Sequence, residues 1–450
     1  MFRGPIQAHS YIGALPVELL DIIFKELCYM LPKREPKTQL LKQLASVCRF
    51  WSNTLSLNPS FWTSILIIVG KTPTTLADVH MHLSLSGNQL LDIHFLGRGI
   101  FHSPADETSQ VAKFMILLRP HISRWRSFNA RLHHQEALPW PGIDILGRAP
   151  KLTRLYLKSR EPDDEGCNPI QYLMEGFLIA PSLKELHVDG FIFKNTYLEK
   201  PKLLASVTSV SISHFAMYHE PTMSLDGLIK CLHALPRLQS LTLSCVELIC
   251  REDAEPLMHA FRPKSITFRC IERYVLNEFF RLINARAPRE LAFIRCDIPN
   301  PSIMRLENVS VLNIQDEWSS ESVLMDYLLR FNGRRLRLAD SSKFGPRELE
   351  ALSCEQPSGQ WVCPYITQLL IDYCAQCTSA NIRRMVEARN TTYAMSGYAQ
   401  RSDPHFKVHP IQFMAIYNCG VLDPADKEWF NANVIHAIWD DWDGGYGEYD

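Results

Sequence analysis

The chain lacks any long run of apolar residues. Of its 450 residues 46% are hydrophobic, yet no window approaches eighteen consecutive apolar side chains, and the nearest run, 65–69, is far too short to cross a bilayer. Residues 1–14, a short lead-in, also lack the apolar stretch of a secretory signal, since glycine and proline interrupt them. These absences predict a soluble intracellular protein, cytoplasmic or nuclear, with no membrane partner.

An excess of charge of one sign is lacking as well. Lys and Arg number 47 against 48 Asp and Glu, which gives a formal charge of -1. Proteins that bind nucleic acid through its phosphates usually carry a basic excess, so nucleic acid is not an expected partner. The 13 cysteines are odd in number and have no framework spacing, which favours reduced thiols used as small core residues.

Sequence motifs for catalysis are missing too. The chain contains no G-x-S-x-G, H-E-x-x-H or G-x-G-x-x-G pattern. A set with metal-ligand character is Cys374, Cys377, His405 and His409, but the gap between the two pairs exceeds the usual zinc-finger spacing. The sequence therefore predicts no enzyme, no cofactor and no metal. A zinc enzyme built on these four residues is the alternative that remains open.

What the chain does have is an N-terminal segment, 15–65, that is dense in large apolar side chains. Proline suits the first turn of a helix, so a helix is expected to start near Pro16. Apolar residues then recur at helical steps along two segments: Leu19, Leu20, Ile22, Ile23 and Leu27, and later Leu40, Leu41, Leu44, Val47, Cys48 and Trp51. So few helices cannot bury all these side chains among themselves. Either a separate partner covers them, or they pack on the domain that follows.

This segment resembles an F-box, the helical module that attaches a receptor to the adaptor subunit of a cullin ubiquitin ligase. The similarity rests on Leu15-Pro16 with Glu18-Leu19-Leu20, on the run 47–51, and on Phe61-Trp62 before a β-branched strand. The insert 29–39 is longer than the loop usually found there. Carried over residue by residue, the resemblance implies these adaptor contacts: Leu15, Pro16, Leu19, Ile23, Val47, Cys48, Trp51 and Trp62. We place their energetic centre at Trp51 and the Leu15-Pro16 pair, because buried aromatic residues dominate such interfaces.

A second pattern, P-x-L-x-x-L-x-L, recurs along the rest of the chain. It stands at 150–157, 181–188 and 236–243, with weaker or shortened copies at 207–212, 265–268, 290–293, 309–314, 335–338 and 366–371, and expected first strands at 90–95 and 125–130. Segments of helical period, such as 224–235, separate these strands. The alternation resembles a degenerate leucine-rich repeat array over residues 75–400. The expected fold class is α/β: a short helical F-box, then an irregular solenoid with a curved parallel sheet and outer helices.

Residues between the motif leucines are expected to form a binding surface. Side chains alternate along a strand, so the leucines point inward and the residues between them line one continuous face. On that face we expect these client contacts: Arg154, Tyr156, Lys158, Glu185, His187, Asp189, Thr242, Arg335, Arg337 and Asp372. Beyond the array, Asp423-Pro424 predicts a capping helix over 423–439, and the acidic, glycine-rich tail 440–450 is expected to be disordered.

The resemblance to F-box proteins with leucine-rich repeats implies a substrate receptor. Its partners would be the adaptor, through the adaptor a cullin, and a client protein held on the repeats. Ubiquitin transfer would belong to other subunits. The alternative is an F-box scaffold that pairs with the adaptor but never presents a client for modification. An array of mixed polar residues fits many partners, so the sequence does not identify the client.

Overall fold

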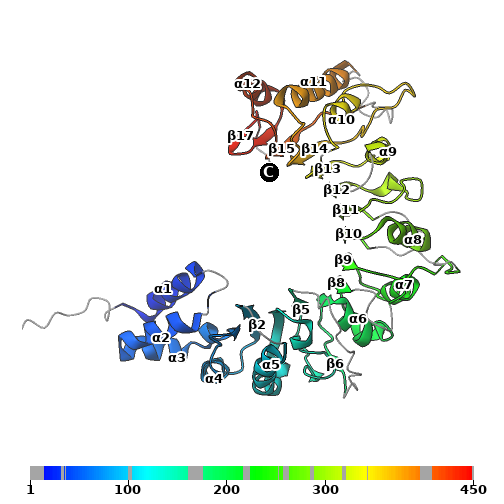
Figure 1. Cartoon of the computed structure of the whole chain (residues 1–450). Helices are drawn as coiled ribbons and strands as arrows, with labels where there is room; N and C mark the ends of the chain where they lie inside the picture. The colour runs from blue at the N-terminus through cyan, green and yellow to red at the C-terminus, as the bar shows by residue number, and fades with distance from the viewer. Residues whose placement is uncertain are drawn as a thin grey trace, which may run out of the picture. The chain divides into compact units, whose positions relative to one another are not determined.

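The protein is mixed α/β, and nearly all of its strand pairings are parallel, as the sequence predicted (Figure 1). The computed structural model describes residues 15–31, 35, 37–99, 104–160, 176–215, 223–251, 253–256, 263–283, 288–316, 321–341, 343–395 and 408–447. The chain divides into two compact units, Met1–Val207 and Thr208–Asp450. The identity of the helical segment as an F-box and of the strands as leucine-rich repeats stays a prediction.

The first unit opens with a small helical core. Its elements are α1 (Val17–Met30), α2 (Lys37–Val47), α3 (Arg49–Leu57) and the 3-10 helix η2 (Pro59–Trp62). Pro16 precedes the first helical residue, and its carbonyl accepts from the amides of Leu19 and Leu20. These elements share one core of buried side chains: Leu20, Phe24, Cys28, Leu41, Leu44, Leu55, Phe61 and Trp62.

Parallel strands follow the helices in the first unit. In their order across the sheet they are β1 (Ser64–Gly70), β2 (Leu91–Arg98), β3 (Trp125–Leu132), β5 (Arg154–Ser159) and β7 (Glu185–Asp189). Between them the chain forms α4 (Leu76–Leu85), α5 (Pro104–Leu118), the 3-10 helices η3 (Arg119–Arg124) and η4 (Gln135–Ala137), and the short strands β4 (Gly147–Arg148) and β6 (Leu178–Ile179), which pair with each other. After β7 come α6 (Gly190–Thr196) and the 3-10 helix η5 (Pro201–Leu204). The ladder aligns Phe128, Leu155 and Leu186, all fully buried, so the motif leucines build the core.

The second unit repeats the same alternation of strand and helix. Its parallel strands, in order, are β8 (Ser209–Phe215), β9 (Ser240–Val246), β10 (Ser265–Arg269), β11 (Glu290–Ile294), β12 (Val311–Gln315), β13 (Arg335–Ala339), β14 (Gln368–Asp372), β15 (Phe413–Tyr417) and β16 (His436–Trp439). Its helices are α7 (Leu225–His233), α8 (Arg273–Ile283), η6 (Leu306–Asn308), α9 (Glu321–Arg330), α10 (Pro346–Ala351), α11 (Ser379–Met395) and α12 (Pro424–Asn433). Within this unit the helices α7 to α11 lie on one side of the strands (Figure 1). The opposite side is the open face of the sheet.

Each strand from β8 to β16 has a residue with a left-handed backbone next to its last residue. Their φ angles lie between 48° and 54°, and none is glycine: His214, Cys245, Cys270, Arg295, Asp316, Asp340, Tyr373, Asn418 and Asp440. Left-handed backbone is unfavourable for residues with a Cβ atom, so surrounding contacts must hold it. Hydrogen bonds to the neighbouring strand do so, since the amides of Arg295 and Asp316 donate to the carbonyls of Gln315 and Ala339 at 2.8 and 2.9 Å.

The ends of the array differ from the sequence prediction. Parallel pairing already includes β1, which begins before residue 75, and it extends beyond residue 400 to β16. The helix expected over 423–439 stops at Asn433, and the tail expected to be disordered contains β17 (Trp442–Gly444), antiparallel to β16. Those two predictions are wrong because residues 436–439 pair with backbone groups at the edge of β15, and β17 then pairs with β16. The predicted lead-in 1–14 lies outside the described residues, as do the last three residues, 448–450.

Candidate protein-binding surfaces

Helix α1 buries one side and leaves the other apolar side exposed. Leu20, Phe24 and Cys28 face the helical core. The opposite side presents large apolar side chains at steps of three and four, which we name the exposed α1 face: Leu19, Ile22, Ile23, Leu27 and Met30. Leu19 and Ile22 are 47% and 55% exposed, and further apolar side chains stand exposed on α2 and α3 at Val47, Phe50 and Leu57. Such a row of apolar side chains on a surface typically marks a binding site for another protein.

Most of the predicted adaptor contacts are accessible. Leu19 and Ile23 lie on the exposed α1 face, Pro16 is exposed ahead of it, and Val47 and Cys48 are exposed where α2 meets α3. Cys48 has extended backbone between the two helices, which breaks the single second helix that the sequence predicted. This break separates Val47 from Trp51, so the two side chains do not continue one helical stripe.

The remaining predicted contacts pack against the core instead. Leu15 and Trp51 are half-buried beside it, and the Trp51 ring meets the edge of Phe24 with centroids 4.9 Å apart. Trp62 is only 2% exposed, and its indole N–H donates to the carbonyl of Leu55 at 2.9 Å. Trp62 is therefore a core residue, and the predicted adaptor contact there is wrong for this conformation. Its aromatic ring completes an interior that the short helices need.

A buried histidine joins the helical core to α4. His82 on α4 donates from Nδ1 to the carbonyl of Trp62 at 3.1 Å, so its Nε2 accepts from the Thr38 hydroxyl at 2.9 Å. Burial lowers the pKa of His82 and favours the neutral ring. The single side chain therefore connects α2, η2 and α4. Sequence reasoning missed it, because an isolated histidine gives no sign of its partners.

The side chains of β2, β3, β5 and β7 that alternate with the buried ones form the open face of the first unit, and this face brings several predicted client residues together. Because the strands pair in register, His94, Asn129, Tyr156 and His187 form one row across four strands. The Tyr156 and His187 rings lie 5.4 Å apart, and the guanidinium of Arg131 lies 4.8 Å from the centre of the Tyr156 ring. We name this cluster the Tyr156 patch: His94, Arg131, Arg154, Tyr156, Lys158 and His187.

The charges around the Tyr156 patch act on its histidines. Burial lowers the pKa of His94, and nearby Arg154 and Arg131 lower it further, although Asp92 opposes them. Burial also lowers the pKa of His187, with Arg131 and Lys158 acting in the same direction against Glu185. Both rings therefore stay neutral at neutral pH beside a group of cations.

Two members of the patch were missed by the sequence analysis, and one predicted residue does not belong. Arg131 and His94 lie on strands whose register the sequence left open; an alternating reading of 91–98 and 125–132 would have found them. Asp189 is fully buried: its carboxylate accepts from Gln135 Nε2 at 2.8 Å and caps α6 through the amide of Phe191 at 3.3 Å. The predicted client contact at Asp189 is wrong, because this carboxylate is a helix cap.

Glu185, also predicted, is exposed on β7 of the first unit and pairs with Arg154 in the ladder. The remaining predicted client residues lie on the open face of the second unit. Thr242 is half-buried there, between Ser211 and Thr267 in the ladder. Arg335 and Arg337 on β13 are exposed, and the Nε of Arg335 donates to Gln368 Oε1 at 2.5 Å. Asp372 accepts from Asn418 Nδ2 at 3.1 Å. The predicted client residues thus fall into a first-unit group and a second-unit group.

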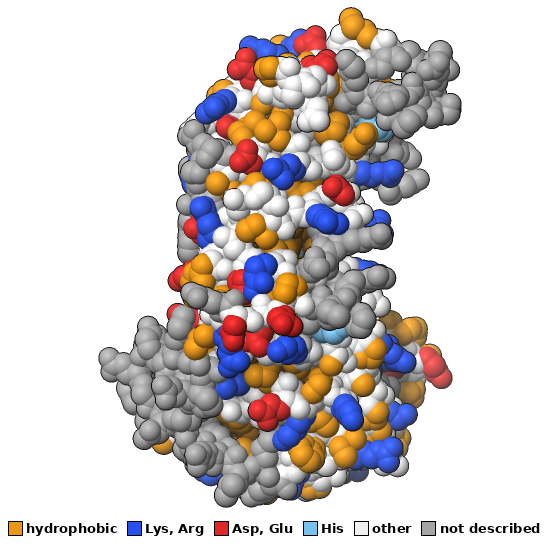
Figure 2. Space-filling model, turned by 90° about the vertical axis from the view of Figure 1, so that its right-hand side faces the viewer, with side chains coloured by type: hydrophobic (Ala, Val, Ile, Leu, Met, Phe, Trp, Pro, Cys, Tyr) orange, Lys and Arg blue, Asp and Glu red, His pale blue; other side chains and the backbone are white. Residues whose placement is uncertain are grey.

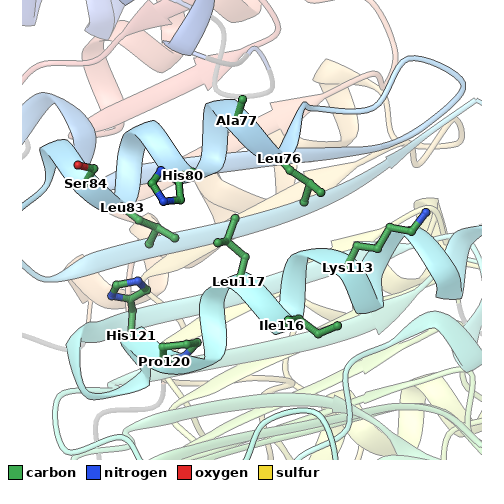
Figure 3. Close-up of a pocket in the computed structure, with 10 residues that line it drawn as sticks. All are labelled: Leu76, Ala77, His80, Leu83, Ser84, Lys113, Ile116, Leu117, Pro120 and His121. Carbon is green, nitrogen blue, oxygen red and sulfur yellow. The ribbon is translucent and has the colours of Figure 1, made fainter.

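An apolar groove runs between α4 and α5 on the first unit (Figure 3). It has a volume of about 740 Å³ and is lined mainly by aliphatic side chains, with Lys113 and His121 toward opposite ends of the view. Its lining residues are Leu76, Ala77, His80, Leu83, Ser84, Lys113, Ile116, Leu117, Pro120 and His121. Apolar side chains of a ligand would fit this groove, but it holds few polar groups that could orient one.

The described residues hold no candidate metal site. No group of three or more His, Cys, Asp or Glu side chains among them is arranged around a common point. Cys374 and Cys377 are fully buried, and the thiol of Cys377 donates to the carbonyl of Phe344 at 3.7 Å; His405 lies outside the described residues.

On the face in Figure 2, side chains of both charges are interspersed with hydrophobic ones.

Comparison of the chain with protein-family models and with the curated proteins finds no match. In the part of the chain that the structure describes, no helix has both the length and the apolar character needed to cross a bilayer. The candidate protein-binding surfaces are the exposed α1 face, the Tyr156 patch and the open face of the second unit.

Proposed function

We propose that this protein is the substrate-recognition subunit of an SCF-type ubiquitin ligase. Helices α1 to α3 form an F-box that docks on the adaptor and, through it, on a cullin. The strand and helix units are degenerate leucine-rich repeats, and their open faces hold a client protein. The chain is not an enzyme and takes no cofactor. Its contribution is proximity, which raises the effective concentration of a client lysine near the transfer machinery.

The exposed α1 face is the observation that carries this proposal. A three-turn stripe of apolar side chains on this helix is 37% to 75% exposed, while the residues behind it fill a small core. Aliphatic side chains in water are unfavourable by about 25 cal/mol per Å² of apolar surface, so covering them with a partner is favourable. The F-box resemblance of the same segment names the adaptor as that partner.

Binding of purified full-length chain to recombinant adaptor, measured by titration calorimetry, tests the first half of the proposal. Ile23→Asp should raise the Kd at least about tenfold, because it puts a charge into an apolar contact. Lys25→Ala, on the same helix but outside the exposed α1 face, should leave the Kd unchanged. Thermal unfolding should be the same for all three proteins. If the unmodified chain does not bind the adaptor, the proposal fails.

A second experiment tests whether the chain presents a client for ubiquitylation. A receptor would do so, and a scaffold would not. Proximity labelling with the full chain would identify candidate clients, which are then tested for ubiquitylation in a reconstituted ligase. A receptor should promote modification of at least one client, and Ile23→Asp should abolish it. If the chain pairs with adaptor and cullin but no labelled protein is modified, the scaffold alternative holds.

A further inference from the structure

The groove between α4 and α5 has the length and the lining to hold one helix. On α4 the lining residues recur at steps of three and four, which places them in a straight stripe along the helix: Leu76, Ala77, His80, Leu83 and Ser84. The ten residues of α4 extend about 15 Å. Figure 3 shows Leu117 of α5 directed toward this stripe, so aliphatic side chains of both helices form the walls. An apolar groove of this kind accepts the apolar face of an amphipathic helix.

The groove is open to solvent and contains no negative charge. At its rim Ile116 is 75% exposed and Leu76 is 46% exposed. Among the described residues that line it, none is acidic, and Lys113 is the one lysine or arginine. Lys113 is exposed and forms no ion pair with any described residue. An occupant that matches this lining has an apolar ridge and a carboxylate.

The exposed α1 face is such a ridge. From Leu19 to Met30 it extends about 16 Å, which matches the length of the α4 stripe. Glu26 lies within this face, three residues after Ile23 and four before Met30. Its carboxylate is exposed and, like the ammonium of Lys113, has no ion-pair partner among the described residues. The ridge thus carries one unpaired carboxylate, and the groove carries one unpaired ammonium.

Helix α1 cannot enter the groove of its own chain. Its buried side is packed in the helical core through Leu20 and Phe24. Met81 and Leu85 of α4 pack against that core as well, and they lie on the opposite side of α4 from the groove stripe. The core and α4 therefore stand between the exposed α1 face and the groove. Only a second copy of the chain can bring the two surfaces together.

We propose that the chain self-associates, with the exposed α1 face of one copy docked in the α4–α5 groove of another. Docking buries apolar side chains of both surfaces and pairs Glu26 of one copy with Lys113 of the other. A two-fold symmetric pair would contain this contact twice. One helix face covers only part of the roughly 1,600 Å² of a standard interface, so the association is expected to be weak and reversible.

Self-association would regulate access to the adaptor. The adaptor and the second copy need the same α1 face, so the two complexes exclude each other. A free receptor would cover its docking face in a pair, and the adaptor would separate the copies. This regulatory role rests on the proposed function, whereas self-association rests only on the two surfaces.

Sedimentation equilibrium of the full-length chain without adaptor tests the inference. Between about 1 and about 100 µM the average mass should rise from that of one chain toward that of two. Ile116→Asp should raise the Kd of self-association at least about tenfold, because it puts a charge into the apolar groove. Val421→Asp, at an apolar residue of the second unit that is 92% exposed, should leave this Kd unchanged. A chain that stays monomeric throughout this range, or self-association that Ile116→Asp does not weaken, would overturn the inference.

An exchange of charges identifies the occupant of the groove. Lys113→Glu and Glu26→Lys should each raise the Kd of self-association about fivefold, because each sets like charges against one another. The double variant exchanges the two charges and should restore the original Kd, which a loss of folding could not do. If the double variant associates no better than the single ones, α1 is not the occupant and the inference fails.

Addition of recombinant adaptor separates this inference from the proposed function. The adaptor should dissociate the paired copies, and Ile116→Asp should keep the adaptor Kd of the unmodified chain. Adaptor that binds while the copies stay together would show that the α1 face is not in the groove. A chain that self-associates as described but binds no adaptor would refute the proposed function and leave self-association standing.

Discussion

At the scale of single residues, Arg389 is an unusual interior group. It lies fully buried on α11, and no carboxylate accepts from its guanidinium in the described residues. Instead the guanidinium donates to five backbone carbonyls, those of Leu352, Val362, Cys363, Pro364 and His409, at 3.0 to 3.4 Å. Burial lowers the pKa of Arg389 to about 10, so it stays charged at neutral pH. The side chain holds the loop between α10 and β14 in place.

Replacing this arginine should destabilise the second unit. Arg389→Met removes the guanidinium donor from five carbonyls, although those of Cys363 and Pro364 still accept from the amides of Ile366 and His409, so we expect the free energy of unfolding to fall by about 3 kcal/mol. Arg384→Met, an exposed arginine on the same helix, should change it by less than about 0.5 kcal/mol. Urea denaturation monitored by circular dichroism measures both. Equal losses in the two variants would show that the carbonyl contacts do not stabilise the fold.

His82 should make the stability of the first unit depend on pH. Its folded pKa is lowered, so the folded state prefers the neutral ring. The contribution of this preference is complete above the unfolded pKa of about 6.5 and is lost as the pH falls below it toward the lowered value. The thermal midpoint should therefore drop between pH 7.5 and pH 5.5. His82→Gln should weaken this drop, and His80→Gln, an exposed histidine on the same helix, should keep it.

Which residues could be predicted from sequence depended on whether their partners were local. The alternation of motif leucines correctly placed Leu155 and Leu157 in the core and Tyr156 on the open face. The same alternation failed at Asp189, because the strand ends there and the residue caps the next helix. Trp62 reads as a surface anchor in the sequence, but its acceptor is seven residues away across a turn, which no periodicity indicates.

At the scale of elements, the strands with a leucine motif and the N-terminal strands were predicted, and the C-terminal strands β15 to β17 were not. Each copy of the motif from 150 to 371 lies on a strand, since buried leucines at alternate positions fit no other element there. β16 has no such motif, and Ile438 and Trp439 continue the helical spacing of α12. Only the free edge of β15, which the sequence does not reveal, makes these residues a strand.

The C-terminal hairpin should depend on one glycine. Gly445 follows β17 with φ 136°, and a Cβ atom there would lie 2.2 Å from the carbonyl oxygen of Ile435. Gly445→Ala should therefore release β17, lower the free energy of unfolding by about 2 kcal/mol or more, and expose the edge of β16. Thermal unfolding with light scattering would detect both effects. A chain lacking only residues 448–450 keeps β17 and should behave as the full chain does.

At the scale of the whole molecule, the N-terminal helices are not a separable appendage. Met81 and Leu85 of α4 pack against the helical core, and Lys42 pairs with Asp78 across the same boundary. A chain lacking residues 1–65 also loses the start of β1 and both partners of His82. We expect this truncation to lower the thermal midpoint or to aggregate, whereas Ile23→Asp keeps the fold. A truncated chain as stable as the full chain would contradict this interdependence.

The α/β class and the exposed α1 face could be predicted from the sequence, whereas the full set of residues in the Tyr156 patch could not. Periodicity reports which residues are buried, and from that the parallel sheet follows. The Tyr156 patch depends on register between strands from 91 to 189, and register is set by pairing that no single strand encodes. The exposed α1 face was predicted because an excess of apolar residues over available interior is visible in composition.

The left-handed residue at the end of each strand from β8 to β16 bears on how such a chain evolves. The backbone bends in the same way whether aspartate, cysteine, arginine or tyrosine occupies that position. The turn after each strand therefore has the same backbone geometry, whichever of these residue types occupies it. Gene duplication or loss of one strand-and-helix repeat would preserve the backbone geometry of every remaining turn, so a lineage could lengthen or shorten its sheet while its N-terminal helices stayed constant.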